Sequence, residues 1–460
     1  MAIAVSRRIG AVSNQGGEIV AHRDQFKTQP RQQRVSRRTF LRGATAAAGS
    51  AALSGITGLP MASKARAADK PVEIVFMHVW GTPPGEKSAS IKHPATLLIE
   101  AFNAKNTGVT VRGETPSTDY FATLTKAQAQ MAAGRPPALV TTPWANIHYA
   151  VQGLQVVSLE KLGGNEVQQV LGNYKEEVLP LVTLNKETVG LPLAFSCPVM
   201  YYNNDIMKQA GVDPAQLFMD WGSFKTLGAK VRAVTGNPIL GLGNNPDWEA
   251  QSIIQCNGGR VLDDNGKPVW DSPEAVAAMQ TIADINKAGL YLQSTTSESN
   301  AAFIGGSLAI WMASIASLGG LTKQVKFDLK TSPFPVFPGK PRRMSSGGSF
   351  IGCYARDKDQ QRGAWEFLKF VASKEGMDIW LKTGYLNATK YDEPVLPGQD
   401  AAYTQLKEGL TRESPWPGSR AAEIQKVWGT YVARIWAGDI SAADGCKQAK
   451  QQVGPLLPKS

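Results

Sequence analysis

PVEIVFMHV, at Pro71–Val79, and PATLLIEAFN, at Pro94–Asn103, establish the fold class of this chain. The first segment alternates apolar positions and is rich in β-branched residues, which predicts a strand, and the second has apolar residues at helical spacing. Asn106-Thr107-Gly108 ends that helix, and Val109–Arg112 predicts the next strand. This order is typical of a layered α/β domain with a largely parallel sheet.

The same alternation continues along the chain. Tyr120–Ala133 predicts a helix that leads into a strand at Ala138–Thr142. Ser272–Ala288 has an ordered helix start and stop, and Asp359–Ser373 is amphipathic. In open sheets of this class, ligands bind at the carboxyl ends of the strands, so we expect a binding site there.

The amino terminus predicts an export signal. Ser36–Arg42 (SRRTFLR) precedes a run of small and mildly apolar residues, and Ala65-Arg66-Ala67 fits a signal-peptidase site. We therefore interpret residues 1–67 as a twin-arginine signal peptide that is removed from a periplasmic bacterial protein. The run is broken by Pro60 and is too rich in small residues for a membrane anchor. The first cysteine is Cys197, which argues against lipid modification at the cleavage site.

Charge argues against nucleic acid as a partner. The formal net charge of +11 comes mostly from the predicted signal, because residues 68–460 hold 38 basic and 36 acidic residues. The dense basic footprint of a nucleic-acid-binding protein is missing from this part.

The remaining length predicts two domains, because it exceeds the size at which one hydrophobic core stops growing. Its cysteines have no metal-ligand spacing, and either disulfides or buried free thiols fit them. They are Cys197, Cys256, Cys353 and Cys446.

The order of short motifs resembles the family 1 extracellular solute-binding proteins, the group containing maltose-binding and glycerol-3-phosphate-binding proteins. The motifs that carry the resemblance are Gly190-Leu191-Pro192, Cys197–Asp205 (CPVMYYNND), Ala210–Pro214 (AGVDP), Trp221–Phe224 (WGSF), Cys256–Gly259 (CNGG), Phe303–Ile310, Gly347–Ser349 (GGS), Trp365–Phe370 and Thr383–Leu386 (TGYL). Two departures, Asn387 after TGYL and Gly306-Ser307, blur the subgroup and with it the ligand.

The resemblance implies a two-lobed α/β fold of the periplasmic binding protein type (type II), with a ligand cleft between the lobes. We expect one lobe from residues 68–195 plus 305–335 and the other from 196–304 plus 336–460. We expect the chain to cross from one lobe to the other near Phe195, Gly305 and Phe334. The family implies a monomer that closes on its ligand by hinge motion and delivers it to the inner-membrane permease of an ABC transporter.

A sugar offers hydroxyl groups and apolar faces, so its site needs aromatic side chains and hydrogen-bonding partners. Trp80 and Trp144 follow predicted strands, and Trp248 lies in the polar segment Asn244–Trp248, which predicts a loop. Tyr120 opens its helix. The resemblance adds four further candidates for ligand contact: Ser196, Gly348, Tyr385 and Arg420, the last as a group that could hold a phosphate.

We therefore predict a carbohydrate-binding or polyol-binding transport protein that needs no cofactor or metal. A glycerol-3-phosphate or glycerophosphodiester ligand is the alternative, and a receptor role would use the same cleft. An exported carbohydrate-active enzyme is the rival of another class. No GxSxG, GxGxxG or HExxH pattern supports catalysis.

Overall fold

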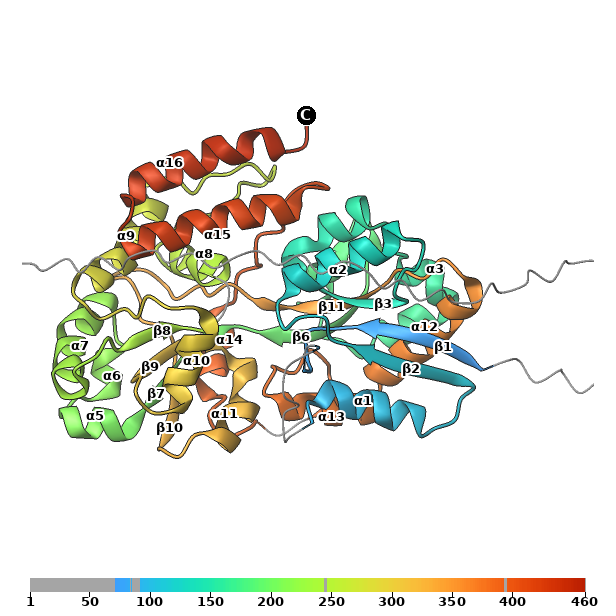
Figure 1. The fold of residues 1–460 in the computed structure, drawn as a ribbon, viewed down its shortest axis with the longest axis horizontal. Coiled ribbons are helices and arrows are strands. Elements are labelled where there is room, and N and C mark those ends of the chain that lie inside the picture. Colours follow the sequence, from blue (N-terminus) through green and yellow to red (C-terminus); the bar gives the residue numbers. More distant parts are fainter. Residues whose placement is uncertain (1–70, 83, 85–91, 244–245, 393–394, 460) are drawn as a thin grey trace, which may run out of the picture. The chain divides into compact units, whose positions relative to one another are not determined.

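The computed structural model describes residues 71–82, 84, 92–243, 246–392 and 395–459. The predicted signal peptide, residues 1–67, lies outside this part. Two mixed β-sheets, each flanked by helices, organise the described chain (Figure 1). A separate two-stranded hairpin joins β4 (Thr183–Leu184) to β5 (Glu187–Thr188).

The first sheet has five strands in the order β2-β1-β3-β11-β6. β1 pairs in parallel with β2 and β3, whereas β11 pairs antiparallel with β3 and β6. The strands are β1 (Val72–Met77), β2 (Val109–Glu114), β3 (Leu139–Pro143), β6 (Leu191–Ser196) and β11 (Gly347–Cys353).

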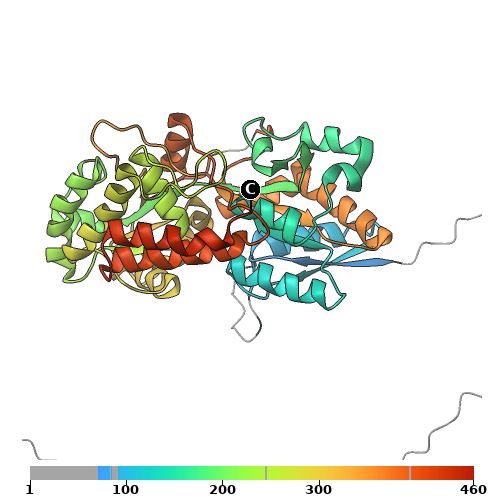
Figure 2. The same cartoon turned by 90° about the horizontal axis from the view of Figure 1, so that it is seen from above.

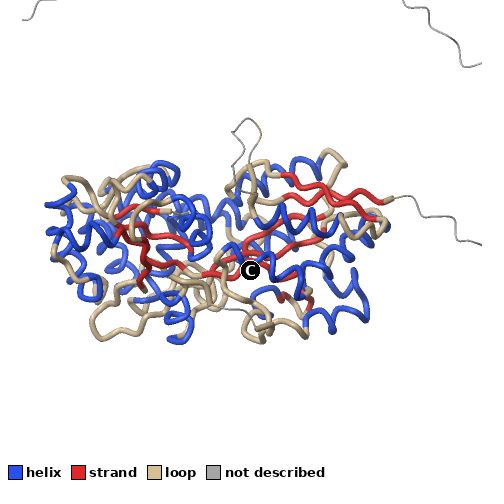
Figure 3. The backbone as a smooth tube through the Cα atoms, turned by 90° about the horizontal axis from the view of Figure 1, so that it is seen from below, coloured by secondary structure: helices blue, strands red, loops and turns tan. Residues whose placement is uncertain are grey.

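The second sheet has four strands in the order β10-β7-β9-β8. β8 and β9 are parallel, and β7 pairs antiparallel with both β9 and β10. The strands are β7 (Pro198–Asn203), β8 (Leu240–Leu242), β9 (Ile310–Ser314) and β10 (Leu329–Ser332). Figure 3 shows the two groups of strands separated along the chain's long axis.

We use "first lobe" for residues 71–196 and 347–392, and "second lobe" for residues 198–346 and 395–459. The helices of the first lobe are α1 (Pro94–Asn103), α2 (Tyr120–Ala132), α3 (Leu159–Gly163), α4 (Val167–Leu171), α12 (Lys358–Ala372) and α13 (Lys374–Trp380). Those of the second lobe are α5 (Asn204–Ala210), α6 (Pro214–Leu217), α7 (Trp221–Thr235), α8 (Pro246–Cys256), α9 (Pro273–Lys287), α10 (Thr296–Ile304), α11 (Leu318–Gln324), α14 (Asp400–Glu408), α15 (Ala421–Ala437) and α16 (Ala442–Val453). α15 and α16 lie side by side against α9 (Figures 1 and 2).

Local sequence sets the helix starts. The Asp119 side chain accepts from the Ala122 N–H at 2.8 Å and caps α2, and Ser272 caps α9 just before Pro273. A reciprocal capping box between Thr295 and Glu298 begins α10. These side chains satisfy N–H groups that the first turn of a helix leaves without partners.

Strand pairing corrects the predicted division into lobes. β9 and β10 come from residues 305–335, assigned to the first lobe, but they pair with β7 of the second. β11 comes from 336–460, assigned to the second lobe, but it pairs with β3 and β6 of the first. The chain changes sheets between Ser196 and Pro198 and again between Ser332 and Gly347, whereas no change occurs near Gly305, where α10 leads to β9 of the same sheet.

All four cysteines are buried and unpaired, so the free-thiol interpretation holds for each of them. Burial raises the pKa of Cys197 and Cys446 to about 12 and that of Cys256 and Cys353 to about 11, which keeps the thiols protonated. Among the described helices, none has the combined length and apolar character that crossing a membrane requires.

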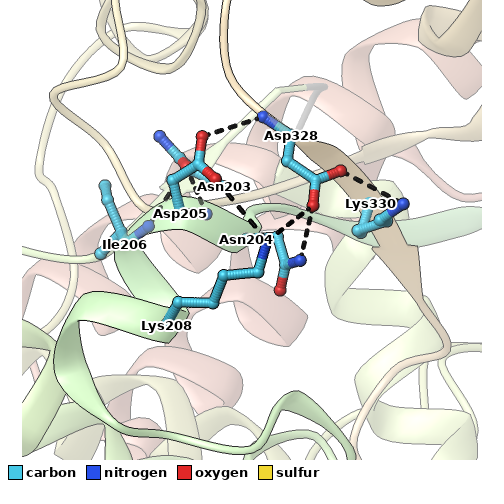
Figure 4. Close-up of polar contacts among 7 residues, drawn as sticks. All are labelled: Asn203, Asn204, Asp205, Ile206, Lys208, Asp328 and Lys330. Atoms are coloured by element: carbon cyan, nitrogen blue, oxygen red, sulfur yellow. Dashed lines mark hydrogen bonds and ion pairs between the residues drawn. The ribbon is translucent and has the colours of Figure 1, made fainter.

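A polar network ties α5 to the start of β10 (Figure 4). The Asp328 carboxylate accepts from the Asn204 side chain at 2.7 Å and pairs with Lys208 and Lys330, both at 3.2 Å. The Asp205 carboxylate in turn accepts from the Asp328 backbone N–H at 3.1 Å. The network joins an edge strand to a helix that begins about 120 residues earlier.

Candidate functional site

A cavity of about 670 Å³ lies between the two lobes. Its walls come from residues that follow the carboxyl ends of β1 and β3 in the first lobe and of β8 and β9 in the second. They include Trp80, Asn146, Gly243 and Ser317. This is the position that open α/β sheets use for ligands, and the volume falls within the range of small-molecule sites.

Six of the eight residues predicted to contact a ligand line this cavity. They are Trp80, Tyr120, Ser196, Trp248, Gly348 and Tyr385. The first and the last of them, Trp80 and Tyr385, are 305 residues apart in the sequence, so it is the fold that brings the six together.

Aromatic rings form one wall. The Trp80 indole N–H donates to the Tyr385 hydroxyl at 3.3 Å, and the two rings are nearly perpendicular at 6.4 Å between centroids. Trp380 stacks behind Tyr385 at 5.1 Å and packs its edge against Trp80. His93, which caps α1, lies parallel to Trp80 at 6.2 Å. Neighbouring rings thus hold Trp80 and Tyr385 in fixed orientations.

Tyr120 continues this wall from the first turn of α2. Its ring meets Trp80 at 6.4 Å and 89°, and its hydroxyl donates to Ser349 Oγ at 3.1 Å. Gly348, beside Ser349 in β11, has a φ of 136°, and a Cβ there would collide with the Ala194 carbonyl oxygen. Only glycine lets β11 pass this close to β6 at the cavity.

Trp248 lies in the first turn of α8 and not in the loop predicted for it. Its indole N–H donates to the Ser346 carbonyl at 3.4 Å, and a side chain at Gly347 would collide with its ring. The ring therefore packs directly on the backbone that leads into β11, and it joins the second lobe to the first at the cavity.

The other two predicted residues lie outside the cavity. Trp144 is 2% exposed and packs in the core of the first lobe against Phe195 at 5.8 Å, because the turn after β3 directs it inward. Arg420 precedes α15 on the surface, where its guanidinium pairs with Glu423 at 3.0 and 2.5 Å. An ion pair three residues away satisfies this arginine, so the structure does not place it in the cleft.

Sequence reasoning missed the acidic groups of the cavity, which are Asp119, Asp247 and Glu413. Asp119 is the cap that precedes Tyr120, and Asp247 is the neighbour of Trp248, so both stand next to residues that were predicted. No local pattern indicates Glu413, which lies between α14 and α15.

A chain of amides connects the lobes beside these acids. Gln425 of α15 donates to Asp247 Oδ2 at 2.8 Å and accepts from the Asn146 side chain at 3.2 Å. Asn146 belongs to the turn after β3 in the first lobe. Nearby, the backbone N–H of Trp416 donates to the Ala145 carbonyl at 2.8 Å. The carboxyl-terminal segment therefore contacts both lobes at the cavity.

Burial shifts the acidity of the groups around the cavity. Desolvation raises the pKa of Asp247 to about 7, against the opposing hydrogen bond from Gln425, and it raises the pKa of Glu413 well above its usual range. It lowers the pKa of His93 to about 4, so this imidazole is neutral at pH 7 and its Nδ1 can accept from the Ala95 N–H at 3.1 Å. Among the described residues that line the cavity, none is a lysine or an arginine.

A second cavity of about 1080 Å³ adjoins the first, since Glu413 lines both. It contains the cations that the first lacks. They are Arg260, Lys340, Arg343 and Arg412. Arg260 pairs with Asp264 at 2.5 Å, whereas the other three form no ion pair with a described residue. The described part of the chain contains no cluster of His, Cys, Asp and Glu suited to a metal ion.

Solved structures share this two-sheet fold. UgpB from Mycobacterium tuberculosis in complex with glycerophosphocholine matches with a TM-score of 0.70 at 22% identity, over 84% of this chain and 98% of that one. Maltose-bound MalE3 of T. maritima matches with a TM-score of 0.70 at 19% identity, over 84% of this chain and all of that one. These matches confirm the predicted α/β fold of a periplasmic binding protein.

Relatives are also found by sequence. The sn-glycerol-3-phosphate-binding periplasmic protein UgpB of Yersinia enterocolitica is 31% identical over 54% of this chain, and the aligned part spans 62% of that relative. Its counterpart from Shigella dysenteriae is 25% identical over 82% of this chain and 91% of the relative. The family model described as bacterial extracellular solute-binding protein matches residues 98–394. The chain therefore belongs to the bacterial extracellular solute-binding proteins, which confirms the resemblance predicted from its motifs.

Proposed function

We propose that this protein is the solute-binding component of an ABC importer and that it binds a carbohydrate or polyol in the cavity between its lobes. It delivers the bound solute, as a monomer, to permease subunits in the inner membrane. Residues 1–67 direct its export to the periplasm through the twin-arginine pathway. As a member of a solute-binding family it binds its small molecule rather than transforming it.

The composition of the cavity wall carries this proposal. Trp80, Tyr120, Trp248 and Tyr385 supply aromatic faces for the apolar side of a sugar ring. Asp247, with Asn146 and Gln425 beside it, supplies acceptors and donors for hydroxyl groups. Because no described lining residue is a lysine or an arginine, the wall offers no cation for a phosphate ester.

A glycerophosphate ligand is the second candidate, and one feature favours it. Arg412 lines the adjoining cavity next to Glu413 and forms no ion pair with a described residue, so it is the cation that we propose for a phosphate group. The relatives named for glycerol-3-phosphate binding add weight to this candidate.

A thermal-shift screen of the purified protein separates the two candidates. The ligands are sugars, polyols, glycerol-3-phosphate and glycerophosphodiesters. A ligand at 100 times its Kd stabilises the folded state by about 2.7 kcal/mol, which is readily measured as a rise in Tm. We expect a rise with one class of sugar or polyol, and loss of that rise in Trp80→Ala.

Arg420→Ala is the matched control, because this residue lies outside the cavity and should leave the response unchanged. A rise with glycerophosphates alone, lost in Arg412→Ala, would replace the carbohydrate by the second candidate. A response that survives Trp80→Ala and Tyr385→Ala would show that the ligand binds elsewhere.

A further inference from the structure

The acids of the cavity have no cationic partner. Asp119, Asp247 and Glu413 line it, and none of them forms an ion pair with a described residue. His93, the described histidine of the wall, is neutral at pH 7 because burial lowers its pKa to about 4. A carboxylate removed from water without a counter-charge is costly, so burial keeps Asp247 and Glu413 protonated to higher pH, whereas Asp119 is exposed.

These acids come from three separate parts of the chain. Asp119 caps α2 in the first lobe, Asp247 opens α8 in the second, and Glu413 lies between α14 and α15. After burial itself, the charge of Asp119 raises the pKa of Asp247, and the charge of Asp247 raises that of Glu413. Movement of the lobes toward each other would strengthen this repulsion unless a cation lay between them.

One carboxylate oxygen of Asp247 has no hydrogen-bond partner. Asp247 is fully buried, and its Oδ2 accepts from Gln425 at 2.8 Å, whereas its Oδ1 has no hydrogen-bond partner in the structure. Buried polar atoms are nearly always satisfied, and Asp247 lines the cavity, so we take the missing partner of its oxygen to be a donor supplied by the ligand. Both oxygens of Glu249, which does not line the cavity, also have no partner.

The aromatic wall suits the same kind of group. Trp80, Tyr120 and Tyr385 line the cavity, and the rings of Tyr385 and Tyr120 lie at 81° and 89° to that of Trp80. The face of an aromatic ring attracts a cation, most strongly where water is excluded. Carboxylates and ring faces together are the usual surroundings of an ammonium group in a protein.

From this geometry we infer that the ligand carries a protonated amine, as in an amino sugar or amino polyol, and that Asp247 and Glu413 receive its ammonium group. The inference rests on the proposed carbohydrate function and narrows its substrate class. The ammonium supplies up to three N–H donors and one positive charge. A donor would pair with the free oxygen of Asp247, and the charge would serve as the counter-charge of the carboxylates. The hydroxyl groups and ring face of the same molecule contact Tyr385, Trp80 and Gln425.

Matched pairs of ligands test this inference on the full chain. Isothermal titration calorimetry compares glucosamine with glucose, galactosamine with galactose, and the deacetylated chitin disaccharide with cellobiose. At about pH 6 the amines are protonated, and we expect at least one amino sugar to bind about tenfold or more tightly than its hydroxyl counterpart.

Binding should also release protons at that pH. Burial raises the pKa of Asp247 to about 7, and a nearby ammonium would favour its ionised form, so the carboxyl gives up its proton when the ligand arrives. Titrations in two buffers that differ in ionisation enthalpy measure this release. A neutral sugar should release far fewer protons.

Three conservative variants test which carboxyl groups cause the preference for the amine. Asp247→Asn and Glu413→Gln should remove the preference for the amine, whereas Glu249→Gln should keep it. Glu249 is the control because it lies on the same helix as Asp247, is equally buried and also has a raised pKa, yet does not line the cavity. Thermal melts of the three proteins verify that each is folded.

Equal or tighter binding of the neutral sugars would overturn the inference and leave the carbohydrate function standing. Binding of glycerophosphates with no response to any sugar would overturn both. A preference for the amine that persists in Asp247→Asn and in Glu413→Gln would show that these carboxyl groups do not receive the ammonium.

Discussion

At the scale of single residues, buried carboxyl groups distinguish the cavity and its surroundings. Asp247 is fully buried with an unpartnered oxygen, and burial raises its pKa to about 7. Glu413 and Glu249 are buried nearby and also have raised pKa values. Carboxyl groups in such positions cost folding free energy, which proteins tolerate where a ligand uses them.

Asp247→Asn should therefore stabilise the empty protein in a pH-dependent way. In the unfolded chain this carboxyl loses its proton near pH 4, whereas in the folded chain it holds the proton up to about pH 7. The contribution of Asp247 to stability is thus full below about pH 4 and falls as pH rises toward 7. The variant should raise Tm by a few degrees at about pH 8 and change it little at about pH 4.

Melts followed by circular dichroism at the two pH values measure this difference. Asp439→Asn, at an exposed position after α15, serves as the control, and its Tm relative to the unmodified protein should be the same at both pH values. An Asp247→Asn shift of equal size at both pH values would contradict the assigned pKa.

At the scale of elements, α5 and β10 are joined by the charges around Asp328. Hydrogen bonding from Asn204 and the ion pairs with Lys330 and Lys208 lower the pKa of Asp328 to about 2. A depressed pKa means that the stabilisation is present above about pH 4 and is lost as pH falls toward 2. The network lies at the surface, so salt screens it.

Asp328→Asn should accordingly lower Tm slightly at neutral pH, with a smaller effect in about 0.5 M salt and a smaller effect near pH 2. Thermal melts across salt concentration and pH measure both trends. The residue lies in the second lobe away from the cavity, so ligand affinity should be unchanged. A Tm difference insensitive to salt would indicate that lost backbone geometry, and not charge, causes the effect.

Elements whose signals are local were predicted closely. α1 spans the predicted Pro94–Asn103, and α2, α9 and α12 agree with their predicted ranges to within one or two residues. Their caps and apolar faces lie in the segments themselves. The failure of the lobe boundaries has the opposite origin, because β9, β10 and β11 acquire their sheet from partners that are distant in sequence.

The residues of the candidate site divide in the same way between those with a local sequence signal and those brought in only by tertiary structure. Tryptophans and tyrosines next to strand ends or motifs could be found from sequence, and six of the eight predicted residues line the cavity. Glu413 and Gln425 could not, because only tertiary structure brings them to Asp247. Arg420 lies outside the cavity and pairs with a glutamate three positions along the chain, which no motif reveals.

At the scale of the described chain, the two lobes meet at a cavity that both of them line. Gln425 of the second lobe contacts Asn146 of the first, and the Trp248 ring lies against Gly347, the first residue of β11. A ligand bound between the lobes favours the closed arrangement only as far as it contacts that arrangement better than the open one. We propose that closure by hinge motion then distinguishes the loaded protein from the empty one.

Small-angle X-ray scattering of the protein with and without its saturating ligand tests this account most directly. Binding in the cavity between the lobes predicts a smaller radius of gyration with ligand, and no change in Trp80→Ala at the same ligand concentration. An unchanged radius of gyration in the ligand-saturated protein would contradict closure around the solute.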